Sequence, residues 1–224
     1  MQAAVNQDVH QSRRAAILEA AESVFADAGY DRARLEDVAL RVGIRRASLF
    51  HHFPDKSSLY AAVTASMGHD LATRFRRALE SDGSPGARLE RTVDEWLDYL
   101  TERPTFVRIM LRELADGASE HARPFAEQAL TVLAALRAVV DEGQAAGSLL
   151  PADGLQVLSA SLGASTFLAL YGAVLGSGAS DVGPPLANRD QHRALLIAMF
   201  RNFLGTHRTG PAPETHATDS GGVP

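Results

Sequence analysis

The stretch Arg34-Leu-Glu-Asp-Val-Ala-Leu-Arg-Val-Gly-Ile-Arg-Arg-Ala-Ser-Leu-Phe-His-His-Phe-Pro-Asp-Lys56 decides the fold of this chain. It predicts two short helices that meet at Gly43, where the absence of a Cβ permits a sharp turn. Apolar residues recur at helical spacing on one face of each helix. They are Leu35, Val38, Ala39 and Val42 in the first helix, and Ile44, Leu49 and Phe53 in and around the second. This pattern predicts a helix-turn-helix.

The outward face of the second short helix carries hydrogen-bond donors and cations. The residues left on that face are Arg45, Arg46, Ser48, His51 and His52. Such a face fits the major groove of DNA, where arginine binds guanine edges or phosphate. A metal site is the rival interpretation of the two histidines, but adjacent side chains point in different directions on a helix and no third ligand follows at helical spacing. We therefore predict a DNA-reading helix and no metal.

The composition is that of an ordinary globular protein, with 46% hydrophobic and 22% charged residues in 224. The net charge is −5, so any contact with DNA must come from a local basic cluster. The chain has no cysteine, which excludes disulfides and thiolate metal sites and fits a reducing compartment. No secretion signal is found at the start of the sequence, and we expect a cytoplasmic protein.

Helical periodicity continues along the chain and predicts an all-α fold of about nine helices. We expect a three-helix N-terminal domain over residues 10–56, a connecting helix over 56–81 and a second helical domain over 82–205. Residues 1–9 are expected to be loose, and 206–224 a disordered tail. The individual helices are predicted over about 10–28, 56–81, 87–101, 119–145, 152–176 and 189–205, with another that begins at Pro104 and ends by Asp116-Gly117.

One segment, Leu155 to Gly176, contains no charged residue and is long enough to span a bilayer. It also contains polar residues that weaken it as a lipid-facing helix, namely Gln156, Ser159, Ser161, Ser165 and Thr166. Its small residues would let two helices approach closely. We expect a buried helix at a dimer interface and no membrane contact.

A longer pattern of residues extends the helix-turn-helix on both sides, over residues 13–60. Its positions are Ile17, Leu18, Ala20, Ala21, Phe25, Gly29, Tyr30, Val38, Ala39, Gly43, Ile44, Ser48, Leu49, His52, Phe53, Lys56 and Leu59. This pattern resembles the DNA-binding domain of TetR-type bacterial transcriptional repressors. The rest of the chain resembles this family only in its run of amphipathic helices. The resemblance implies a homodimeric repressor that binds a palindromic double-stranded operator and leaves it when a small-molecule effector binds. It also implies dimerisation through the helices near 152–176 and 189–205.

The resemblance and the outward face together give a set of DNA-contacting residues. The set is Arg34, Arg45, Arg46, Ala47, Ser48, Phe50, His51, His52 and Lys56. Lys56 matches the phosphate-binding lysine of the family, whereas Phe50 stands where a tyrosine is usual. Arg34 and Arg45 stand where the family commonly has Ser or Thr, which would cap a helix and contribute about 1 kcal/mol. Our hypothesis is that capping was exchanged for positive charge facing the duplex.

Large side chains on the later helices predict an effector pocket. They are Trp96, Tyr99, Phe106, Met110, Phe125, Phe167 and Tyr171. Such residues line concave apolar sites, and a helical core needs the same residues. We expect a largely apolar effector, and no set of residues fixes its charge.

Other classes of function find less support. We find no G-x-S-x-G, no H-E-x-x-H, no phosphate-binding loop and no cysteine nucleophile, so we predict neither an enzyme nor a cofactor. The remaining alternatives are a helical protein-interaction module and a DNA-binding regulator without a ligand. The arginine-rich outward face counts against the interaction module.

Overall fold

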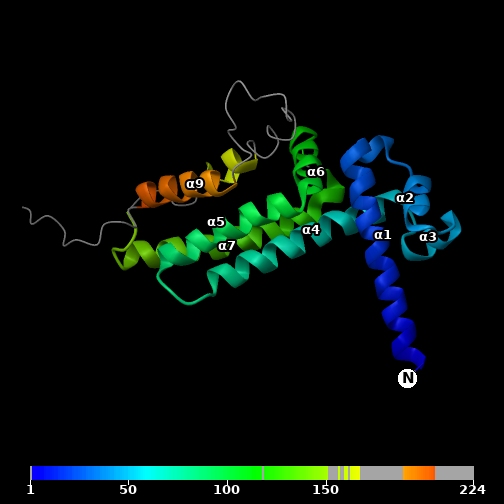
Figure 1. The fold of residues 1–224 in the computed structure, drawn as a ribbon, viewed down its shortest axis with the longest axis horizontal. Helices are drawn as coiled ribbons and strands as arrows, with labels where there is room; N and C mark the ends of the chain where they lie inside the picture. Colours follow the sequence, from blue (N-terminus) through cyan, green and yellow to red (C-terminus); the bar gives the residue numbers. More distant parts are fainter. Residues whose placement is uncertain are drawn as a thin grey trace, which may run out of the picture.

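The computed structural model describes residues 2–117, 119–150, 156, 159–160, 162–166 and 189–204. These residues form helices and short connections, and no strand occurs among them, which confirms the all-α prediction (Figure 1). Most of the helix predicted over 152–176 and the whole tail 206–224 lie outside the described residues. None of the described helices is long and apolar enough to cross a membrane.

The first helix, α1 (Gln2–Arg32), is longer than the sequence predicted at both ends. The expectation of a loose segment over 1–9 is wrong for residues 2–9, because no glycine or proline interrupts the helix there. Gly29 does leave the helical conformation (φ 76°), as the predicted stop required. The chain then resumes one more turn, in which the amide of Ala33 donates to the carbonyl of Gly29.

The helix-turn-helix is formed by α2 (Leu35–Val42) and α3 (Arg46–His52), and its prediction is confirmed. Gly43 takes the left-handed conformation (φ 70°, ψ 35°), and the amide of Ile44 donates to the carbonyl of Ala39 (3.0 Å). This pattern satisfies carbonyls that the end of α2 would leave without partners. Val38 and Leu49 are buried against the core of α1, so the turn holds α3 at a fixed angle.

The long helix α4 (Lys56–Leu79) begins at a capping box. The amide of Ser58 donates to Asp55 Oδ1 (2.7 Å), and the amide of Asp55 donates to Ser58 Oγ (3.3 Å). Its buried face contacts α1 at one end and the C-terminal helices along its length. The helix therefore belongs to both halves of the molecule.

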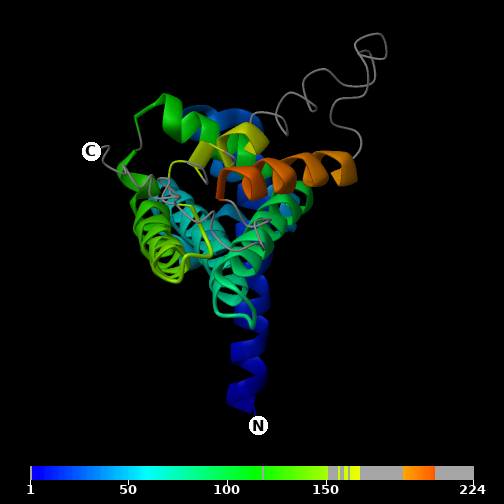
Figure 2. The same cartoon turned by 90° about the vertical axis from the view of Figure 1, so that its left-hand side faces the viewer.

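The remaining helices are α5 (Pro85–Glu102), α6 (Pro104–Ala115), the short η1 (Glu120–Ala122), α7 (Arg123–Ala145) and α9 (Arg189–Leu204). Of these, α5, η1 and α7 pack on α4, whereas α6 packs on α1 and α9 packs on α5. Figure 1 shows α4, α5 and α7 side by side with α9 along α5, while α6 lies toward the helix-turn-helix. Figure 2 shows the start of α1 extending away from this bundle.

The close approach of α7 to α4 depends on Gly68. A Cβ at this position would lie 3.2 Å from both Cα and Cδ2 of Phe125, which is tighter than ordinary van der Waals contact. The glycine therefore sets how near the two helices lie. Phe125 of α7 lies where α4, α6 and α7 meet, because it contacts Gly68 of α4 and its ring centroid lies 5.8 Å from that of Phe106 on α6.

Candidate DNA-binding surface and effector cavity

The predicted DNA-contacting residues lie on the outer side of the helix-turn-helix. The exposed members are Arg34, Arg45, Arg46, Ala47, Phe50 and His51, and the half-buried members are Ser48, His52 and Lys56. Arg34 and Arg45 are the N-cap residues of α2 and α3, and neither side chain makes a capping hydrogen bond. The prediction that these two helices lack side-chain caps is confirmed.

The two arginines at the start of α3 differ in their surroundings. Arg46 pairs with Glu36 of α2 (2.5 Å), and its guanidinium lies 5.2 Å from the ring centroid of Phe50. Both members of the ion pair are more than half exposed, so it contributes little and can be exchanged for another anion. Arg45 has no partner among the described residues and is available to an incoming phosphate or base.

Lys56 has contacts that the sequence did not reveal. Its Nζ donates to the carbonyl of Asp31 at the end of α1 (2.8 Å) and lies 4.7 Å from the ring centroid of Tyr30. A cation near the C-terminus of a helix is favourable. Lys56 therefore joins the start of α4 to the end of α1, and its phosphate contact stays a prediction.

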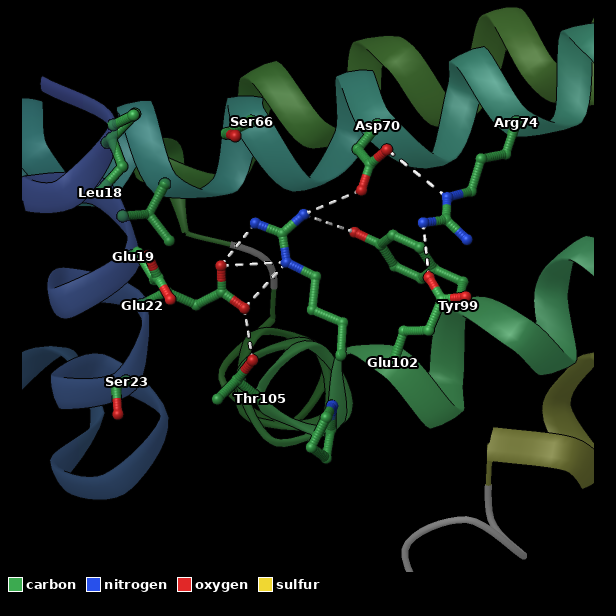
Figure 3. A pocket seen from close by; sticks show the side chains of 14 residues that line it. Leu18, Glu19, Glu22, Ser23, Ser66, Asp70, Arg74, Tyr99, Glu102 and Thr105 are labelled. Atoms are coloured by element: carbon green, nitrogen blue, oxygen red, sulfur yellow. Dashed lines mark hydrogen bonds and ion pairs between the residues drawn. The ribbon is translucent and has the colours of Figure 1, made fainter. Parts of the chain in front are cut away.

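A buried ion pair joins α1 to the corner between α5 and α6. Glu22 is 7% exposed, and its carboxylate accepts hydrogen bonds from Nε and Nη2 of Arg103 (2.5–3.0 Å) and from the hydroxyl of Thr105. Nη1 of Arg103 donates to Asp70 (3.3 Å) and to the hydroxyl of Tyr99 (3.2 Å). These residues line a polar cleft of about 590 Å³. Figure 3 shows Glu22, Asp70 and Tyr99 converging on this cleft from three helices.

The surroundings of Arg103 raise its pKa. Burial, the largest single effect, lowers the pKa, but the hydrogen bond to Glu22 and the further interactions with Tyr99 and Glu22 together outweigh it. Sequence reasoning missed the pair, although one signal was present. Glu22 lies at helical spacing between Leu18 and Ala26, on the side of α1 that faces the core.

A second polar contact ties α4 to α6 and η1. The hydroxyl of Tyr60 donates to Glu113 Oε1 (2.5 Å), and Oε2 of the same buried carboxylate accepts from the amide (3.0 Å) and hydroxyl (2.8 Å) of Ser119. Burial, and then the hydrogen bond to Glu113, raise the pKa of Tyr60 well above its usual value. The phenol therefore stays a donor across the physiological pH range.

His121, on η1, touches both the first and the fourth helix. Its Nδ1 lies 2.9 Å from Ser57 Oγ, and its carbonyl accepts from Thr64 Oγ1 (2.9 Å). Its ring lies 4.7 Å from that of Tyr30 near the end of α1. Because η1 leads directly into α7, a shift of α7 would reach both α1 and α4.

The helix α6 is bound to α1 through arginines. Nη1 of Arg112 donates to the carbonyls of Phe25 (3.0 Å) and Ala26 (2.8 Å), just before the kink of α1 at Gly29. Arg108 pairs with Asp27 (3.0 Å). A shift of α6 would therefore move the end of α1, which packs on α2.

An apolar cavity of about 390 Å³ lies between α4, α5, α6 and α7. Of the predicted pocket residues, those that line it are Trp96, Phe106, Met110 and Phe125. Tyr99 lies outside it and lines the polar cleft instead, because its buried hydroxyl donates to the carbonyl of Met67 (3.1 Å) and accepts from Arg103. Phe167 and Tyr171 lie outside the described residues.

A second cavity, of about 610 Å³, lies between α4, α6, η1 and α7. Four residues line both cavities and stand between them, namely Met110, Leu114, Phe125 and Ala129. In the described part of the chain, no group of three or more His, Cys, Asp or Glu is placed to hold a metal ion.

Comparison with known families accounts for this arrangement. Residues 17–63 match the "Bacterial regulatory proteins, tetR family", and residues 82–169 match the "Tetracyclin repressor-like, C-terminal domain". The two ranges together cover more than half of the chain. The chain belongs to the TetR family. The helix-turn-helix lies within the first matched range, and α5, α6 and α7 lie within the second.

Individual TetR-family relatives are distant. The chain is 34% identical over 88 residues to the HTH-type transcriptional activator FasR of Mycolicibacterium smegmatis, which is 39% of this chain and 40% of FasR. It is 29% identical over 149 residues to the HTH-type transcriptional regulator RutR of Escherichia coli, which is 63% of this chain and 66% of RutR. The crystal structure of the TetR family regulator PfmR from Thermus thermophilus has a TM-score of 0.66 at 22% identity, over 83% of this chain and 97% of that one.

Proposed function

We propose that this TetR-family protein is a DNA-binding transcriptional regulator that acts as a homodimeric repressor. Two copies of α3, related by a two-fold axis, read a palindromic operator in successive major grooves. The observation that carries the proposal is the exposed start of α3, where Arg45 has no partner among the described residues and Arg46 has only a weak one. In a chain of net charge −5, this local cationic surface is the part suited to DNA.

The proposed contact set is the one predicted from the sequence, and its members differ in the part of the DNA that they contact. The side chains of α3 and the cap residue Arg34 contact bases and phosphates, and Lys56 contacts phosphate from the start of α4. The proposed DNA-binding domain covers 10–56, α4 connects the domains, and 82–205 binds the effector and the second subunit.

The packing of α9 supports the proposed dimer. One face of α9 lies on α5, where Leu196 is 2% exposed and Arg193 and Arg201 form bidentate ion pairs with Asp94 and Glu90 (2.6–2.8 Å). The outer face leaves Leu195 57% exposed, next to the exposed Ala194 and Ala198. An apolar face of this kind is suited to the same face of a second copy across a two-fold axis.

Release from DNA follows in this proposal from the position of the cavities. A ligand that displaces Met110 or Phe125 shifts α6 and the start of α7. Arg112 passes the movement of α6 to α1, and His121 passes that of α7 to α1 and α4. The ligand thereby favours a spacing of the two α3 helices that does not fit the operator.

Binding-site selection from random double-stranded DNA tests the proposal. We expect the purified protein to select a palindrome whose half-sites are one helical turn apart, or a multiple of it. The variant Arg45→Ala/Arg46→Ala should fail to enrich this palindrome, while Arg137→Ala, an exposed arginine of α7, should enrich it as the wild type does. A wild-type protein that selects no two-fold symmetric site would contradict the proposal.

A further inference from the structure

The apolar cavity between α4 and α7 has an unusual chemical lining. Among the described residues that line it, none carries a charge. Its polar groups are the indole of Trp96, the side-chain amide of Gln128 and the hydroxyl of Thr166, which already donates to the carbonyl of Leu162 (2.8 Å). An ion placed in this cavity would lose its water and gain no counter-charge.

Two hydrogen-bond donors of the lining have no acceptor among the described residues. Trp96 is 7% exposed, and its Nε1 is buried without a partner. The amide of Gln128 makes no hydrogen bond to any described residue, although the side chain is half-buried in the wall of the cavity. Nε1 of Trp96 is enclosed and has almost no surface open to the cavity. The half-buried amide of Gln128 is therefore the donor of the lining that can pair with an acceptor supplied from outside the chain.

We infer that the effector of this cavity is an uncharged, largely apolar molecule with one acceptor oxygen, of the carbonyl or ether type, bound by the side-chain amide of Gln128. The inference rests on the proposed function and names the class of its ligand. The cavity selects by two differences. It rejects a carboxylate or an ammonium group because no described lining residue compensates the charge. It favours a ketone over an alkane because only the ketone accepts a hydrogen bond from Gln128.

The volume of the cavity limits the size of this ligand. About 390 Å³ is near the lower end of the range for small-molecule sites. A longer amphiphile would have to pass Met110 and Phe125 and place its head in the neighbouring cavity, which is lined by Glu113, Glu120 and Arg123. Tight binding of an ionised fatty acid would support that arrangement and overturn the inference.

The sequence supplies a built-in reporter for the test, because Trp96 is the single tryptophan of the chain. We would titrate the full-length protein at pH 7 with octan-2-one, octanoate, octylammonium and octane, and follow the emission of Trp96. Octan-2-one should bind roughly tenfold more tightly than either ion and several-fold more tightly than octane. Equal or tighter binding of octanoate or octylammonium would refute the inference.

Variants of Gln128 test whether its side-chain amide determines which ligand the cavity prefers. Gln128→Leu should weaken octan-2-one several-fold and leave octane unchanged, and Gln11→Leu, an exposed glutamine of α1, should change neither. Gln128→Glu should shift the preference toward octylammonium, because it adds the missing counter-charge. Unchanged ligand preference in both Gln128 variants would contradict the assignment.

Binding is measured on the protein without DNA, so this test is separate from that of the proposed function. If octan-2-one binds selectively but does not release the operator, the proposed release mechanism fails and the assignment of the cavity stands. If the protein shows no preference for the uncharged ligand, the assignment fails whatever happens on DNA.

Discussion

The ion pair between Glu22 and Arg103 allows a quantitative prediction for the variant Arg103→Ala. The side chains are only 9% and 23% exposed, and three nitrogen–oxygen contacts of 2.5–3.0 Å join them. Removing the arginine leaves the buried carboxylate with the hydroxyl of Thr105 as its remaining partner among the described residues. Breaking a buried pair in this way costs about 3–5 kcal/mol of unfolding free energy.

In a chain of this size, each kcal/mol lowers the melting temperature by roughly 2–4 °C, so the variant should melt about 6–20 °C below the wild type. Thermal and urea unfolding, followed by circular dichroism, measure the loss. The matched control is Arg137→Ala, whose partner Asp141 lies one helical turn away at 3.3 Å. Both members of that pair are more than half exposed, so the control should change stability by less than about 0.5 kcal/mol.

Two results would refute this reasoning. One is a loss below about 1 kcal/mol in Arg103→Ala, which would mean that the carboxylate of Glu22 is rehydrated at little cost. The other is a free energy of unfolding for the double variant Glu22→Met/Arg103→Met that is no higher than that of Arg103→Ala. Apolar residues of similar volume should recover stability, because no charge is then left buried and unpaired.

Three further predictions concern the helix ends near the DNA-binding surface. Arg34→Ser supplies the side-chain cap that α2 lacks and should raise stability in urea by about 1 kcal/mol, and an unchanged midpoint would contradict this. Gly43→Ala should lower stability by roughly 1–2 kcal/mol through its positive φ alone, since no atom lies within 4 Å of the new Cβ; a neutral effect would show that the turn relaxes. Hydrogen bonds from the backbone amide and then from the side chain of Ser58 lower the pKa of Asp55 in the folded state. The cap therefore stabilises the fold above about pH 4, and this contribution is lost as the pH falls through the lowered pKa of the folded state. An NMR titration in which the pKa of Asp55 is not lowered would contradict this assignment.

The local features of the DNA-binding domain could be predicted from the sequence. The turn at Gly43, the buried face of α2 and α3, and the missing caps at Arg34 and Arg45 each depend on residues close together in the chain. Helical periodicity also predicted the order of the later helices. The length of α1 was underestimated because polar composition was taken as a sign of a loose segment, whereas helix propagation needs only the absence of breakers.

Contacts between distant helices could not be predicted. Glu22 and Arg103 are 81 residues apart, and Tyr60 and Glu113 are 53 apart, so each pairing depends on how helices pack rather than on any local pattern. The same limit applies to Tyr99. A large aromatic residue on α5 fits an effector pocket or a structural contact equally well, and its side of the helix becomes known only from the packing.

The central claim is that the start of α3 supplies the DNA contact, and Arg45→Ser tests it most directly. Serine can cap α3, so the variant stays folded while it loses one cation. The measurement is the affinity for the selected operator over a range of salt concentrations, with Arg137→Ser, at an exposed arginine of α7 outside both cavities, as the matched control. We predict weaker binding and a slope of log K against log salt that is smaller in magnitude by about 1, with both quantities unchanged in the control. An affinity and a salt slope of Arg45→Ser equal to those of the wild type would contradict the account.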